Sequence, residues 1–147
     1  MTHSFQKSLS VGKRGEQALH KLFPSWTRLD GLKADFVTPL GTKIECKFES
    51  RASTETENFA MELQSRPGRP GAIQQAVQNG CEFITYLFSD GELFCFRCDL
   101  LLHWLVMNAH KHRQVEIPNK TYKTTIVLIP RKELRKLEVP IEQLSKR

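Results

Sequence analysis

Apolar and polar residues alternate along several stretches of this chain, and alternation with a period of two is typical of half-buried β-strands. The clearest signal lies in residues 33–48, where Pro39 and Gly41 supply a turn between two short alternating runs. This stretch predicts a β-hairpin. The other expected strands are 26–29 (a strand or an extended loop), 58–64, 82–88, 92–98 and 122–129.

Other stretches have helical spacing. Residues 12–23 predict a helix that Pro24 ends, and residues 72–79 predict a second one. Asp99 is expected to cap a third helix, and a short terminal helix is expected to begin at Pro130. In the third helix most of the apolar residues are expected in the core: Leu100, Leu101, Trp104, Leu105 and Met107. Strands and helices in this order predict an α/β fold.

Two connecting segments are rich in polar residues. Residues 49–57 are expected to form a surface loop beside the hairpin, while residues 65–71 form a basic loop rich in glycine and proline. In the second segment the glycines allow close approach of a phosphate, and the following helix N-terminus favours an anion. Residues 1–9 are polar and are expected to be poorly ordered.

Composition narrows the choice of protein class. A chain of 147 residues with 39% hydrophobic and 26% charged residues suits a single globular domain. The net charge of +6 favours a polyanionic partner. We expect a cytoplasmic protein with reduced cysteines, because the chain shows neither a signal-peptide pattern nor an apolar run of the roughly 18 residues that a membrane helix needs.

Charged residues of the predicted hairpin are candidates for chemistry. Glu45 and Lys47 lie two residues apart, so their side chains leave the same face of the strand, and Asp35 lies on the neighbouring strand. Two carboxylates this close repel each other unless a proton or a cation lies between them. Magnesium takes oxygen ligands of this kind.

Asp35, nine intervening residues and then Glu45-Cys46-Lys47 resemble the core motif of the PD-(D/E)XK nuclease superfamily, with Ala34 where the family usually has proline. The order of elements is also similar: a helix with an acidic residue, a strand with Asp, a turn, a strand with Glu-x-Lys, then strand, helix and strand. The resemblance covers roughly residues 10–90 and looks closest to small phage-type or junction-resolvase-like members.

The resemblance implies a restriction-endonuclease-like core (αβββαβ) with a mixed central sheet flanked by helices. Residues 91–147 would extend it with a β-hairpin, a helix and a strand, giving one domain over 1–147. The implied activity is metal-dependent hydrolysis of DNA phosphodiester bonds, selective for DNA structure, as in recombination or repair. A homodimer is a reasonable expectation.

The resemblance also implies a site. Mg²⁺ or Mn²⁺ would be held by Asp35, Glu45 and the backbone carbonyl of Cys46, with Glu16 of the first helix completing the set. Lys47 would act on the attacking water. Alternatively, Glu16 is a surface carboxylate that pairs with His20 or Lys13.

Basic residues of the flanking segments are expected to bind backbone phosphates. They are Lys13, Arg14, Lys33, Arg51, Arg66 and Arg69, with Gln75 as a candidate for placing the scissile phosphate. Glu62 is a further candidate ligand only if its strand faces the site; otherwise it is an exposed glutamate.

Other interpretations stay open. The same fold would also suit a non-catalytic nucleic-acid-binding module, an exonuclease, an enzyme acting on RNA, or an interaction protein with a surface ion cluster. Cys95 and Cys98 have zinc-type spacing. Positions three apart on a strand face opposite ways, which argues against a shared zinc ion.

Overall fold

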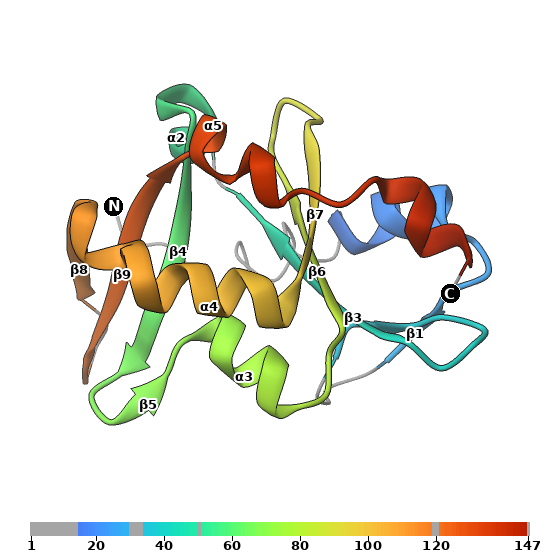
Figure 1. The fold of residues 1–147 in the computed structure, drawn as a ribbon, viewed down its shortest axis with the longest axis horizontal. Coiled ribbons are helices and arrows are strands. Elements are labelled where there is room, and N and C mark those ends of the chain that lie inside the picture. The colour runs from blue at the N-terminus through green and yellow to red at the C-terminus, as the bar shows by residue number, and fades with distance from the viewer. Residues whose placement is uncertain (1–14, 30–33, 50, 119–120, 147) are drawn as a thin grey trace.

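The computed structural model describes residues 15–29, 34–49, 51–118 and 121–146. These residues form two β-sheets with helices around them (Figure 1). Residues 1–9, which were expected to be poorly ordered, and three candidate phosphate-binding residues (Lys13, Arg14 and Lys33) lie outside the described residues.

The first sheet has five strands in the order β1-β2-β3-β6-β7. Its strands are β1 (Thr27–Arg28), β2 (Phe36–Val37), β3 (Lys43–Phe48), β6 (Phe83–Leu87) and β7 (Leu93–Arg97). The predicted hairpin is confirmed, since β2 pairs antiparallel with β3. β6 runs parallel to β3 and antiparallel to β7, so the sheet is mixed and β3 lies in its middle.

The second sheet has four strands in the order β5-β4-β9-β8. Its strands are β4 (Asn58–Arg66), β5 (Arg69–Pro70), β8 (Gln114–Pro118) and β9 (Lys123–Pro130). The expectation of one central sheet is therefore wrong for residues 58–64. β4 pairs with β9 instead and packs its buried face, Phe59 and Met61, against the first sheet. Alternation alone does not indicate which sheet a strand joins.

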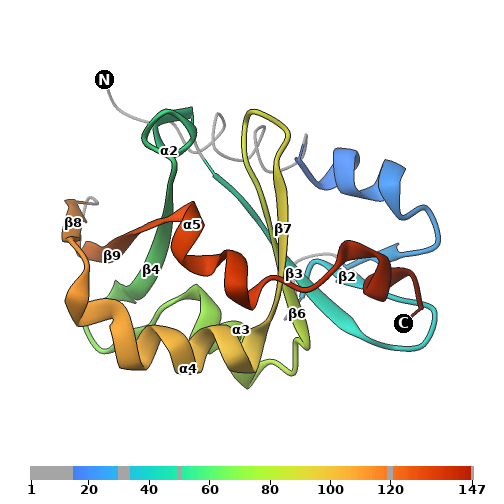
Figure 2. The same cartoon turned by 45° about the horizontal axis from the view of Figure 1, so that its top comes forward.

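Helices cover both faces of the first sheet and also pack on the second sheet. They are residues 15–22, α2 (Arg51–Thr56), α3 (Ala72–Gln78), α4 (Cys98–Asn108) and α5 (Arg131–Leu134), with 3₁₀ turns at Ala109–Lys111, Arg135–Leu137 and Ile141–Lys146. α3 and α4 lie side by side across one end of the space between the two sheets (Figure 1). The C-terminal segment runs past β7 toward the helix at 15–22 (Figure 2).

Two apolar clusters form on opposite faces of the first sheet. The larger fills the space between the two sheets, α3 and α4, and its centre is Phe59, whose ring meets four other aromatic rings at centroid distances of 4.9–5.8 Å. The smaller joins Ile44 and Cys46 of β3 to Leu19 of the first helix and Leu144 near the C-terminus. Ile44 and Cys46 are buried in this cluster, while Phe48 packs against it and is only partly buried.

An arginine-centred network holds the β6–β7 turn against α5. The Arg131 side chain is only 7% exposed, donates hydrogen bonds to Asp90 and Glu92, and lies over the Phe88 ring at 3.8 Å. Arg135 donates to the other oxygen of Glu92. The residues of this network come from distant parts of the chain, so the network fixes the C-terminal segment to the first sheet.

Two local expectations are wrong, and one strand was not predicted. Residues 51–56 form α2 and Glu49 is buried, so this segment is not simply a surface loop. β8 lacked a clear signal because its residues are mostly exposed. α4 begins at Cys98, so Asp99 lies in its first turn instead of capping it, and pairs with Arg97.

The core expected for α4 is only partly correct. Leu101, Trp104 and Leu105 are buried, but Leu100 and Met107 are 51% and 57% exposed. α4 is apolar around much of its circumference, so composition did not reveal the buried side. No helix in the described part of the chain is long and apolar enough to cross a membrane.

Candidate functional site

The β2–β3 hairpin brings the two predicted acidic residues together. Asp35 directly precedes β2, and its amide donates to the carbonyl of Ile44 at 3.1 Å. Because Phe36 pairs with Ile44, Asp35 lies across from Glu45. The Asp35 Oδ2 atom accepts a hydrogen bond of 2.8 Å from the amide of Cys46, which fixes the carboxylate beside β3.

The environment of Glu45 favours its protonated form. Burial is the main cause, and a hydrogen bond with Asp35 and the charge of that carboxylate act in the same direction, raising the Glu45 pKa to about 8. The nearby Lys47 ammonium lowers it but does not compensate. Near neutral pH the two carboxyl groups therefore share a proton unless a cation replaces it.

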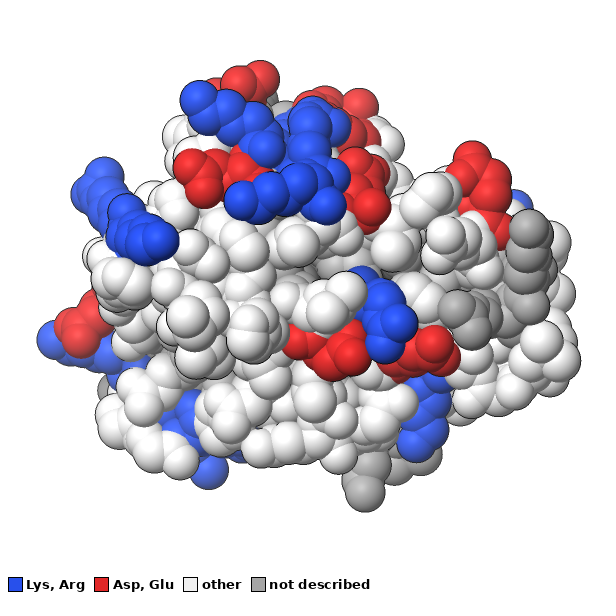
Figure 3. All heavy atoms as spheres, in the orientation of Figure 1, with Lys and Arg blue, Asp and Glu red and all other residues white. Residues whose placement is uncertain are grey.

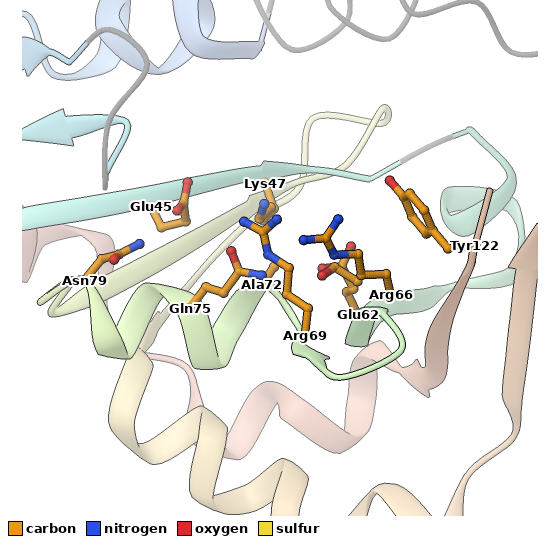
Figure 4. Close-up of a pocket in the computed structure, with 10 residues that line it drawn as sticks. Glu45, Lys47, Glu62, Arg66, Arg69, Ala72, Gln75, Asn79 and Tyr122 are labelled. Carbon is orange, nitrogen blue, oxygen red and sulfur yellow. The ribbon is translucent and has the colours of Figure 1, made fainter. Parts of the chain in front are cut away.

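Glu45 and Lys47 open into a polar cavity of about 300 Å³ (Figure 4). Its lining comes from β3, from the β4–β5 hairpin, from α3 and from the segment before β9. Besides Glu45 and Lys47, the lining residues are Glu62, Ser65, Arg66, Arg69, Ala72, Gln75, Asn79 and Tyr122. In Figure 4 the side chains of Arg66 and Arg69 extend from the hairpin toward Lys47. The cavity thus combines two carboxylates, Glu45 and Glu62, with three cations, while Asp35 lies beside Glu45 without lining the cavity.

Contacts with α3 and β4 hold the β4–β5 hairpin that carries the arginines in place. The segment 65–71, expected as a loop, is a tight hairpin that turns at Gly68 with φ +78°. The Gln75 Nε2 atom donates to the carbonyl of Pro70 at 2.6 Å. Gly71 packs so closely that a Cβ atom there would lie 2.0 Å from the carbonyl oxygen of Glu62. Gln75 therefore positions the hairpin as well as lining the cavity.

Glu16 occupies a different place from the other predicted acids. Its carboxylate accepts a hydrogen bond of 2.6 Å from Arg28 and is absent from the cavity lining. The helix nevertheless lies close to β3, because Gly15 packs against the Phe48 ring where a Cβ atom would approach to 2.2 Å. The structure thus brings Asp35 and Glu45 together but directs Glu16 to Arg28, and its part in the site stays a prediction.

The remaining candidates divide as follows. Arg66, Arg69 and Gln75 line the cavity, as does Glu62, which reaches it from the second sheet. Arg51 begins α2, and its side chain is outside the described set. Sequence reasoning missed three polar lining residues, Ser65, Asn79 and Tyr122. They carried no signal, since each reaches the cavity only through the tertiary fold.

Several other basic side chains are already engaged with acids. Figure 3 shows Lys and Arg gathered among acidic side chains over α5, and a broad uncharged area over α4. The network of Arg131 and Arg135 with Asp90 and Glu92 accounts for part of this arrangement. The net charge of +6 is therefore not concentrated on that face.

The donor atoms near Asp35 are of the kind that hard cations bind. The described residues contain no group of three His, Cys, Asp or Glu side chains gathered to hold a metal ion. The carboxylates of Asp35 and Glu45 and the backbone carbonyl of Cys46 form a different kind of donor set, because only two of its three members are side chains. Since the N–H of Cys46 points to Asp35, the C=O of the same extended residue faces the same edge. An oxygen site of this type, completed by water, fits magnesium.

The cysteines do not form such a site. All four are buried, and no disulfide links them. Cys95 packs in the smaller cluster and Cys98 in the larger one, on opposite faces of the first sheet. This confirms that their side chains diverge.

Fold and site together define an α/β protein with a mixed sheet, whose central strand carries charged residues into a polar cavity. Comparison with protein-family models, with curated proteins and with solved structures gives no match.

Proposed function

We propose that this protein is a metal-dependent nuclease that hydrolyses DNA phosphodiester bonds. The observation that carries the proposal is that Glu45 and Lys47 line one cavity together with Arg66 and Arg69. Asp35 does not line this cavity but lies beside Glu45, to which it is hydrogen-bonded. A phosphodiester needs cations around its oxygens, and arginine forms strong charge-assisted hydrogen bonds with phosphate. The carboxylates would otherwise repel the substrate, which supports a metal ion between them.

Each residue then has a separate task. Asp35, Glu45 and the carbonyl of Cys46 would hold Mg²⁺ or Mn²⁺, which when bound supplies Lewis-acid stabilisation of phosphate charge. Lys47 orients the attacking water and balances negative charge at the phosphate. Arg66 and Arg69 bind the flanking phosphates of the strand, which gives affinity without reading the base sequence.

The order of elements supports a restriction-endonuclease-like core within this fold. A helix with Glu16 precedes the hairpin with Asp35, the strand with Glu45 and Lys47 follows, and α3 leads into the parallel strand β6. We extend the proposal to a structure-selective endonuclease that works as a dimer in the cytoplasm.

One observation favours a second candidate, a non-catalytic nucleic-acid-binding module. The carboxylate of Glu16 is held by Arg28, and the raised pKa of Glu45 lets the acid pair persist with a shared proton and no metal. In that case the arginines would still bind phosphate, but nothing would activate water.

Cleavage assays separate these candidates. Labelled duplex, single-stranded, flap, four-way-junction and RNA substrates are incubated with magnesium, manganese or EDTA, using wild type, Glu45→Gln and Lys47→Ala. Lys123→Ala is the matched control, because Lys123 is 66% exposed on β9. We expect metal-dependent cleavage by wild type and the control only. Binding without cleavage by wild type would overturn the nuclease proposal and favour the binding module.

A further inference from the structure

One aromatic ring lies open to solvent beside the cavity of Glu45 and Lys47. Tyr122 is 41% exposed and lines this cavity. Every other Phe, Tyr and Trp residue that the structure describes is buried or partly buried. Most of them pack against another ring, whereas the Tyr122 ring pairs with no aromatic ring among the described residues. The exposed aromatic surface of the described chain thus lies at the proposed site.

The position of Tyr122 follows from the pairing of the second sheet. Tyr122 lies just before β9, which pairs antiparallel with both β8 and β4. Two residues further along, the Thr124 hydroxyl donates a hydrogen bond of 2.9 Å to the carbonyl of Ser65. Ser65 adjoins Arg66 on β4 and also lines the cavity. This contact holds the start of β9 against the β4–β5 hairpin, so Tyr122 is kept at the cavity together with Arg66.

The cations of the cavity lie between its acidic end and the aromatic ring. In Figure 4, Glu45 lies toward one end of the labelled side chains and Tyr122 at the other, with three cations between them: Lys47, Arg69 and Arg66. The two arginines take part in none of the ion pairs formed by the described residues, so both guanidinium groups can bind phosphate. A phosphate bound among these cations therefore has the acid pair on one side and an aromatic ring on the other.

An exposed aromatic ring beside cations suits an unpaired nucleotide. Every nucleobase has a π-face, so a base of any identity stacks on such a ring while the cations hold the backbone. Within a duplex both faces of a base are covered by its neighbours, so the ring reaches only a base that has left the stack.

We propose that Tyr122 is the stacking platform for the base next to the scissile phosphate, and that the substrate is DNA whose strand is unpaired at this position. Single strands, flaps and frayed ends meet this requirement, whereas a continuous duplex does not. This inference rests on the proposed function for the phosphate position.

Binding in EDTA tests the inference apart from cleavage. A fluorescent thymine oligonucleotide is titrated against the protein beside a strand of the same length that is abasic throughout, which keeps the phosphates and removes the bases. We expect wild type to bind the thymine strand about tenfold more tightly, which corresponds to the stacking of about one base. Tyr122→Ala should bind both strands with the affinity of wild type for the abasic strand. Tyr122→Phe should keep the preference, because it keeps the ring.

Val106→Ala is the control, since Val106 is 73% exposed on α4 and does not line this cavity; it should bind as wild type does. Equal binding of the two strands by wild type, no binding at all, or a preference that Tyr122→Ala retains would overturn the inference. Loss of the preference in Tyr122→Phe would overturn it as well, because the contact would then come from the hydroxyl. A base preference without metal-dependent cleavage contradicts the nuclease proposal alone, and cleavage without a base preference contradicts this inference alone.

Discussion

Replacing Glu45 by Gln should stabilise the protein above neutral pH. The Glu45 carboxyl is largely buried beside Asp35, and its pKa rises from an ordinary 4.5 to about 8 in the folded chain. Gln has nearly the same shape, can donate a hydrogen bond to Asp35 and cannot ionise. The substitution therefore removes the cost of a buried second negative charge without leaving a cavity.

The sign follows from proton binding. Between about pH 4.5 and pH 8 the unfolded chain has released the Glu45 proton while the folded chain retains it. Stability of the wild type is therefore fully present below the lower value and is lost as pH rises through the higher one. At 1.36 kcal/mol per pKa unit the whole interval corresponds to about 5 kcal/mol, which is an upper bound for a site that touches solvent.

Urea unfolding at a series of pH values measures this difference. We expect the two proteins to differ little at about pH 4.5 and Glu45→Gln to gain steadily, becoming more stable by several kcal/mol at about pH 9. Glu49, whose pKa burial raises to about 7, titrates in both proteins, so its contribution cancels. Glu116→Gln serves as a control, because its carboxylate is 63% exposed.

Magnesium adds a second test of the same reasoning. A cation between Asp35 and Glu45 replaces the shared proton, so excess Mg²⁺ at about pH 8 should stabilise wild type by binding to the folded state alone. Glu45→Gln should show no such gain. A stability difference that does not change with pH would refute the buried-charge argument, and an equal magnesium effect in both proteins would refute the metal position.

Four further substitutions have distinct expected outcomes. In urea unfolding, Arg131→Met should lower the free energy of unfolding by about 3 kcal/mol, because it breaks a buried ion pair. Arg135→Ala changes a residue of the same network that is 53% exposed, so it should lower the free energy of unfolding by less than about 1 kcal/mol. Equal losses in the two variants would contradict this difference. Arg66→Ala should weaken DNA binding equally across sequences and reduce the slope of log K against log[salt] by about one. Salt titrations of binding measure this slope, and an unchanged slope would exclude a phosphate contact. Gly71→Ala should cost about 1–3 kcal/mol in urea unfolding, since its Cβ would collide with the Glu62 carbonyl; unchanged stability would show that the hairpin can move.

The hairpin was predictable because its signals are local. Turn residues at 39 and 41 and alternation through 44–48 fix both the register and the facing of Glu45 and Lys47. From this register the approach of Asp35 to Glu45 follows directly. The position of the Glu16 carboxylate was harder to predict. Helical periodicity places Glu16 near the sheet but does not reveal that Arg28, a residue of β1, donates a hydrogen bond to its carboxylate.

The second sheet was not predictable from the same signals. β4 alternates in the same way whether it extends the first sheet or pairs with β9, and its partner is about 70 residues away in sequence. The cavity beside Glu45 and Lys47 forms only because β4 pairs with β9. Glu62 and the arginine hairpin face Lys47 only because β4 leaves the first sheet, and Tyr122 joins them from the segment before β9.

The charge pattern of β3 is itself an argument for function. β3 lies between two neighbours and packs one face on the smaller apolar cluster, so an apolar residue at every position would stabilise it. Instead Glu45, Lys47 and then Glu49 occupy successive alternate positions on the opposite face, and burial raises the pKa of both glutamates. Departures from local rules of this kind concentrate at functional sites. A purely structural role would predict that Glu45→Gln improves the protein in every respect, whereas a catalytic role predicts that this variant gains stability and loses cleavage.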